Sequence, residues 1–65
     1  HMTEIQELKK GDVFVIDNET YRVKNIEVSK IGKHGRAKVR LEVVDLKNNE
    51  EKVMIRISTE KVERK

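Results

Sequence analysis

The sequence predicts a small all-β protein, and three observations lead to this prediction. The apolar residues of the 65-residue chain are mostly β-branched and alternate with polar ones, as in strands with one buried face. Turn-forming residues recur at short intervals between these runs. A chain of this length forms one domain at most and buries only about 60% of its unfolded surface. These features are typical of a small, strongly bent, partly open five-stranded barrel of the SH3-like kind.

The N-terminal quarter is expected to form one short strand between two turns. Residues 4–10 lead in, with two apolar positions spaced for a short helical or extended contact. Residues 9–12 should turn, because Gly11 supplies backbone freedom and the aspartate after it can bond its own main chain. Residues 13–16 are predicted as a short buried strand, and a turn cluster at 17–20 follows it.

The central strands are expected to bend. Residues 21–28 alternate with a one-residue change of phase near Asn25, which indicates a β-bulge or a sharp bend. Residues 37–46 alternate as well. The alternation shifts by one residue after Val43, which indicates a second candidate for a β-bulge. Residues 29–36 show no strand period, so the two strands are expected to form a hairpin with this segment at its tip.

The C-terminal part completes the predicted sheet. Residues 47–51 form a turn with two asparagines, which tolerate left-handed backbone geometry. Residues 53–57 are predicted as a strand with its odd-numbered residues on one face. A helical turn capped by Ser58 or Thr59 is expected to precede a last short strand around Val62.

Alternation along these strands predicts which side chains point into the barrel. The residues expected to face inward are Val13, Val15, Tyr21, Val23, Val39, Leu41, Val43, Val53 and Ile55, and Ile57 is assigned to the core with them.

Composition excludes several classes of function. The chain has no cysteine, so neither a disulfide nor a thiolate site is expected. No apolar run approaches the roughly 18 residues of a membrane span, and a cytoplasmic protein without membrane contact is expected. A single histidine beyond residue 1 provides neither a zinc site nor a nucleophile with its base, so we expect no enzyme and no bound cofactor. Residues 1–2 resemble a tag remnant, which assigns the domain to residues 3–65.

Positive charge is concentrated in residues 28–41. This segment holds five of the fifteen basic residues and no acid, which leaves ten bases against twelve acids elsewhere. A local excess of this kind indicates an anionic partner, most commonly a nucleic acid. A basic edge that prevents strand pairing explains the same pattern about equally well. The five residues expected to contact RNA are Lys30, Lys33, Arg36, Lys38 and Arg40.

The tip of the predicted hairpin carries Lys33 and His34 between two glycines. Gly32 and Gly35 let the backbone turn tightly, so the three residues around Lys33 would shape the loop. The pattern lacks the glycine spacing and the hydroxyl residue of a phosphate-binding loop. Since the only two aromatic residues fall in predicted core strands, base stacking is not expected. The kind of nucleic-acid binding that remains is phosphate contact by Lys and Arg, which gives affinity without sequence readout.

The segment "SKIGKHGRAK", residues 29–38, resembles the signature of the N-terminal domain of translation initiation factor 5A in its archaeal and eukaryotic form. The segments "LKKGDVFVID" (8–17) and "STEKVER" (58–64) resemble the opening strand and the close of that domain. Ile31 stands where the family often has Thr. The resemblance covers nearly the whole chain, and bacterial elongation factor P lacks the histidine of the loop.

This resemblance implies that Lys33 is the lysine converted to deoxyhypusine or hypusine by deoxyhypusine synthase, which uses spermidine and NAD. The factor would then present the long side chain to the acceptor end of peptidyl-tRNA on the ribosome and promote slow peptide-bond formation. The family also has a C-terminal OB-fold domain that is absent here, so we expect an excised domain or a stand-alone relative, and a monomer. The alternatives are a general basic RNA-binding module without lysine modification and a protein-interaction barrel.

Overall fold

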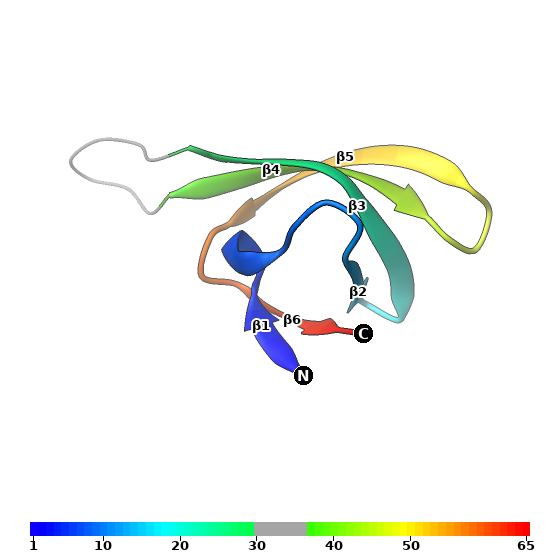
Figure 1. Cartoon of the computed structure of the whole chain (residues 1–65), viewed down its shortest axis with the longest axis horizontal. Coiled ribbons are helices and arrows are strands. Elements are labelled where there is room, and N and C mark those ends of the chain that lie inside the picture. Colours follow the sequence, from blue (N-terminus) through cyan, green and yellow to red (C-terminus); the bar gives the residue numbers. More distant parts are fainter. Residues whose placement is uncertain (30–36) are drawn as a thin grey trace.

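The computed structural model describes residues 1–29 and 37–65, and in them the all-β prediction is confirmed. Six antiparallel strands form one open, strongly curved sheet in the order β1-β6-β2-β3-β4-β5 (Figure 1). The elements are β1 (Met2–Glu4), the 3-10 helix η1 (Ile5–Glu7), β2 (Val13–Ile16), β3 (Glu19–Ser29), β4 (Lys38–Asp45), β5 (Glu50–Ile57) and β6 (Lys61–Arg64). The sixth strand is β1, which overlaps the expected lead-in of residues 4–10 only at Glu4 and pairs with β6.

The core lies inside the curve of the sheet, where side chains from both ends of the chain meet. Its buried members are Ile5, Leu8, Phe14, Tyr21, Val23, Val39, Leu41, Val43 and Val62. The prediction is therefore confirmed for five residues, namely Tyr21, Val23, Val39, Leu41 and Val43. These five belong to β3 and β4, the strands with the clearest alternation.

The predicted phase of β2 is wrong. Phe14 is fully buried, whereas Val13 and Val15, which were expected inside, are half-buried. Phe14 lies opposite Tyr21, and the two ring centroids are 5.6 Å apart. Because all four residues of β2 are apolar, alternation could not indicate the inner face, and the largest side chain occupies it.

The predicted phase of β5 is wrong as well. Val53, Ile55 and Ile57 are 57%, 63% and 42% exposed. The register with β4 explains this result, because Leu41 points inward and lies opposite Met54. Directly opposed residues of paired strands share a face, so the even-numbered residues of β5 face the core.

One of the two predicted bulges is present. The pairing of β3 with β4 shifts between Val23 and Asn25, which confirms the bend near Asn25. The second is wrong, since β4 keeps its alternation to Asp45, which is 3% exposed. Its carboxylate accepts a hydrogen bond from the Lys47 N–H at 2.9 Å and lies 3.6 Å from the Lys52 ammonium. These contacts stabilise a charged group at a buried position.

The turns predicted at residues 9–12, 17–20 and 47–51 are present. Gly11 has a φ of 91°, and the carboxylate of Asp12 accepts a hydrogen bond from the Lys9 N–H at 2.9 Å. Asp17 and Asn18 connect β2 to β3 with φ values of 51° and 66°. Before β6 the chain makes one hydrogen-bonded turn, from the Glu60 N–H to the Ile57 carbonyl, in place of the helical turn that was expected.

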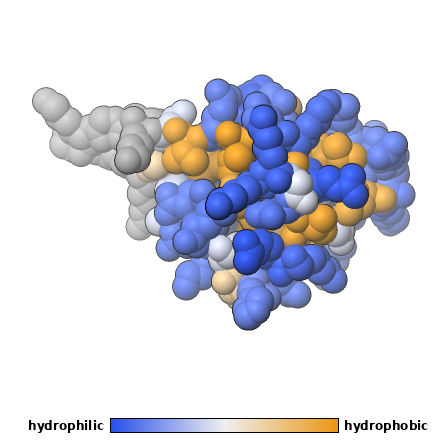
Figure 2. Space-filling model, viewed as in Figure 1, coloured by the Kyte–Doolittle hydropathy of each residue, from blue (hydrophilic) through white to orange (hydrophobic). Residues whose placement is uncertain are grey.

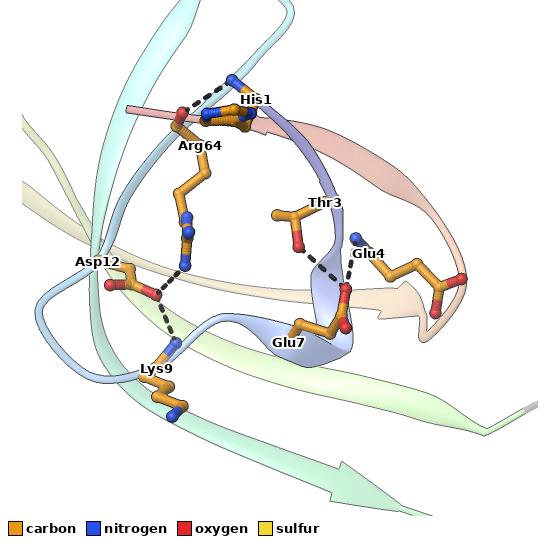
Figure 3. Close-up of polar contacts among 7 residues, drawn as sticks. All are labelled: His1, Thr3, Glu4, Glu7, Lys9, Asp12 and Arg64. Atoms are coloured by element: carbon orange, nitrogen blue, oxygen red, sulfur yellow. Dashed lines mark hydrogen bonds and ion pairs between the residues drawn. The ribbon is translucent and has the colours of Figure 1, made fainter.

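The N-terminal segment closes one side of the barrel. The Ile5 and Gln6 N–H groups donate to the carbonyls of Glu60 and Ser58, at 2.8 and 3.2 Å. Glu7 accepts hydrogen bonds from the Thr3 hydroxyl and the Glu4 N–H, which starts η1 with a capping box (Figure 3). Figure 3 also shows Asp12 between the Lys9 N–H and the Arg64 guanidinium, 3.9 Å away. Met2, expected to be a tag remnant, takes part in β1.

Candidate nucleic-acid interface

The hairpin of β3 and β4 carries the candidate site. The two strands pair from Tyr21 opposite Asp45 to Ser29 opposite Lys38. This arm extends beyond the rest of the barrel (Figure 1). The register places Ser29 opposite Lys38 at the end of the arm, and the chain between these two residues connects the strands. The hairpin predicted from the sequence is thus confirmed.

Most of the predicted site residues lie outside the described residues. These are Lys30, Gly32, Lys33, His34, Gly35 and Arg36. From the sequence, Lys33 is expected to be nearly fully exposed and residues 30–35 to be more mobile than the strands, and both expectations lie outside the described residues. Of the predicted RNA contacts, the structure places Lys38 and Arg40.

Lys38 lies at the end of the arm on the outer face of the sheet. It is exposed and pairs with Ser29 of β3 on one side and Ile57 of β5 on the other. Val39, the next residue, points into the core and is fully buried. This packing anchors the backbone of Lys38 while its ammonium stays in solvent, which suits a contact with phosphate.

Arg40 has acidic partners that the sequence did not indicate. Its guanidinium lies 2.8 Å from the Glu42 carboxylate and 3.6 Å from that of Glu27, which is opposite on β3. The hydrogen bond from Arg40 to Glu42 raises the pKa of Arg40 above its ordinary value, and the charges of both glutamates add to this effect. Arg40 is therefore a cation with two neighbouring carboxylates, and a phosphate would have to compete with them.

The correct hairpin register would have revealed one of these partners. Glu27 lies directly opposite Arg40, and directly opposed residues of an antiparallel pair are close enough for a charge pair. Residues 28–41 contain no acid, but the strand that faces part of this segment does. Further along the same face, Lys24 and Glu51 form another ion pair at 2.9 Å. Ion pairs thus balance much of the charge on the outer face away from the end of the arm.

Metal ions and membranes require other kinds of site. Within residues 1–29 and 37–65, no group of three His, Cys, Asp or Glu side chains is placed to hold a metal ion. In the same ranges no helix is long and apolar enough to cross a membrane. Hydrophobic surface is divided into separate patches by hydrophilic side chains in the view of Figure 2.

Known proteins resemble the chain over nearly its full length. The family model of the translation initiation factor 5A-like N-terminal domain matches residues 1–61. Translation initiation factor 5A of Methanothermobacter thermautotrophicus is 36% identical over 62 residues, which cover 95% of this chain and 48% of that protein. The same factor of Methanosarcina acetivorans is 42% identical over 52 residues, which cover 80% of this chain and 41% of the relative.

Solved structures of related proteins have the same fold as this chain. The structure described as eukaryotic translation initiation factor 5A from Methanococcus jannaschii is 32% identical, with a TM-score of 0.79 and coverage of 97% of this chain and 47% of that one. A family protein from Naegleria fowleri, 24% identical with a TM-score of 0.81, has the same fold. The chain spans about half the length of these relatives. It belongs to the translation initiation factor 5A-like N-terminal domain family.

Proposed function

We propose that this chain is a translation-factor domain that presents Lys33 for conversion to deoxyhypusine or hypusine. The observation that carries the proposal is the match of residues 29–38 to the family signature in a chain that belongs to the family. The paired strands β3 and β4 support it, because they form a hairpin whose described end is Ser29 opposite Lys38, on either side of the segment that contains Lys33. A lysine in such a segment is well placed for access by a modifying enzyme.

The proposed modification lengthens one side chain and adds one charge. The Lys33 amine forms a new C–N bond to the aminobutyl group of spermidine, and the bond from that group to the aminopropyl nitrogen breaks, so that 1,3-diaminopropane leaves. Deoxyhypusine synthase carries out this transfer with NAD as the co-reactant. The product has two amines on one flexible chain, so it makes a dication suited to RNA phosphates.

The proposed partners are the ribosome and peptidyl-tRNA in the cytoplasm. The modified Lys33 would extend toward the tRNA acceptor end, and slow peptide bonds would form faster. Lys38 would hold tRNA phosphates beside it, because it is exposed at the base of segment 30–36. Affinity for free RNA should be weak, on the order of 10⁻⁴–10⁻⁶ M, as for non-specific binders.

Incubation with deoxyhypusine synthase, spermidine and NAD tests the modification. We expect the intact mass to increase by one aminobutyl group and peptide mapping to place the gain at Lys33. Lys33→Arg should abolish the gain, because a guanidinium does not replace the accepting amine. Lys30→Arg, in the same segment, should keep the gain and serves as the matched control. Modification of the Lys33→Arg protein would contradict the assignment.

A second candidate is a basic RNA-binding module that works without lysine modification. The five bases of residues 28–41 favour it independently of the family signature. The same incubation separates the two functions when RNA binding is measured in parallel. An unmodified chain that binds RNA through Lys38, with binding weakened in Lys38→Ala, would support the second function. Modification at Lys33 supports the first.

A further inference from the structure

Strand β5 forms one edge of the sheet and is unusually suited to pairing. It runs for eight residues, Glu50–Ile57, and among the described strands it pairs only with β4. The opposite edge, β1, has three residues. The outer side of an edge strand presents backbone N–H and C=O groups that have no partner within the sheet, and proteins usually keep such edges short or charged.

The outer face of β5 is apolar where an edge strand is expected to be charged. Val53, Ile55 and Ile57 are 57%, 63% and 42% exposed, and they form a row that we call the β5 stripe. Each has a polar neighbour on β4, since Ile57 lies opposite Lys38 and Ile55 opposite Arg40. A β-branched row beside unpaired backbone groups is a template for another strand.

We propose that a second copy of this chain pairs its own β5 with this edge, antiparallel, across a two-fold axis at Ile55. In this register Ile55 faces Ile55 of the second copy, and Val53 faces Ile57. All three residues of the stripe on each copy then acquire a β-branched partner, which is the kind of cross-strand pair that stabilises sheets. On the other face, Met54 lies opposite Arg56 of the second copy, so no like charges meet.

Charge and polarity disfavour the neighbouring registers. A two-fold axis at Met54 would place Lys52 opposite Arg56 of the second copy, and directly opposed like charges destabilise a sheet. An axis at Val53 would place the Glu51 carboxylate against an isoleucine of the stripe. Its one favourable charge pair, Glu50 with Arg56 of the second copy, would compete with the ion pair that Arg56 already forms with Glu60 at 3.3 Å.

The proposed dimer is weak and closed. One pair of short strands buries less than the roughly 800 Å² per partner of a stable interface, so the chain stays a monomer at low concentration. The two-fold axis uses both β5 edges, so pairing stops at two copies and does not continue into fibres. The inference does not depend on the modification of Lys33.

The absence of cysteine from the sequence allows a sharp test. Directly opposed residues of antiparallel strands have Cα atoms about 4.5–5.5 Å apart, which matches disulfide geometry. Ile55→Cys should therefore form a disulfide-linked dimer, on addition of a mild oxidant, at least about tenfold faster than the control Leu46→Cys. Leu46 is 37% exposed and lies outside β5. A mixture of Val53→Cys and Ile57→Cys proteins should form the mixed dimer preferentially.

Sedimentation of the unaltered sequence gives a second readout. We expect the weight-average sedimentation coefficient to rise with concentration, and Ile55→Lys to abolish this rise while Leu46→Lys preserves it. Circular dichroism confirms that both variants fold, as expected for exposed positions. Equal oxidation rates for Ile55→Cys and Leu46→Cys, or no association at high concentration, would overturn the proposal and leave the stripe to a different partner.

Discussion

Leu41 lies fully buried near the middle of β4, between Ile26 on β3 and Met54 on β5. We expect Leu41→Ala to lower the free energy of unfolding by about 2–5 kcal/mol, because it removes apolar contacts and leaves a cavity. Ile55→Ala is the matched control, since Ile55 is 63% exposed. Its effect should remain within about 0.5 kcal/mol. Urea denaturation measures both, and an unchanged midpoint for Leu41→Ala would contradict its place in the core.

Asp45 is a residue whose position on the inner face of the sheet the sequence pattern failed to predict. Alternation along residues 37–43 predicts the inner face of β4 correctly. The alternation was inferred to shift after Val43, yet Asp45 continues the inner face because the Lys47 N–H and the Lys52 ammonium supply partners. The Lys52 ammonium comes close only when β4 and β5 pair.

At the scale of the element, the β2–β3 turn offers a stabilising substitution. Asp17 and Asn18 both have positive φ, as the central residues of a type I′ turn require. Asn18→Gly should therefore raise the free energy of unfolding by a few tenths to about 1 kcal/mol, because glycine adopts this conformation without steric cost. Thermal melting measures the change.

Asn48→Gly is the matched control for this turn substitution. Asn48 lies in the β4–β5 turn without a positive φ, and its side chain accepts a hydrogen bond from the Glu50 N–H at 3.2 Å. The glycine variant should lose this contact and melt at a lower temperature. Equal shifts for the two variants would show that the backbone conformation of Asn18 is not the cause.

The sequence predicted where strands β2 to β6 lie, but not always which of their residues face the core. The patterns located β2 to β6 and the bulge in β3, because apolar alternation and turn residues are local signals. They failed for the inner face of β5, since a row of β-branched residues was taken as buried. Pairing with β4 decides that face, and strand pairing is not encoded within one segment.

For the whole molecule, the ion pairs of Arg40 limit how strongly the domain binds RNA. If Arg40 stays with Glu27 and Glu42, four basic residues of segment 28–41 remain to meet phosphate. The log–log dependence of affinity on salt should then have a slope of at most about −2.8 for single-stranded RNA. The double variant Glu27→Gln, Glu42→Gln should release Arg40 and steepen it toward about −3.5.

Glu50→Gln with Glu63→Gln is the charge-matched control. Both glutamates are exposed and lie away from the end of the arm, so the net charge changes equally without releasing Arg40. Fluorescence anisotropy titrations at several salt concentrations measure the slopes. If the two double variants steepen the slope equally, net charge and not the freedom of Arg40 controls binding.

The candidate site was predictable as a segment, whereas its charge balance was not. The absence of a strand period in residues 29–36 predicted the hairpin of β3 and β4, and the pairing of these strands confirms it, while the residues expected at its tip stay a prediction. Linear sequence gave Arg40 the same role as Lys38, because Glu27 is thirteen positions away along the chain and adjacent only across the strands. Opposed charges on paired strands become visible only once the register is known.

The joining of β1 and β6 has a consequence for how the chain acquires its structure. Met2 pairs with Glu63, and Phe14 pairs with Arg64, so β6, from the other end of the sequence, joins β1 to β2 (Figure 1). Contacts of such long sequence separation are entropically costly and tend to form late. Val62→Ala should therefore accelerate unfolding in stopped-flow experiments and hardly change the folding rate. During synthesis, β1 and β2 cannot be joined until β6 has emerged from the ribosome.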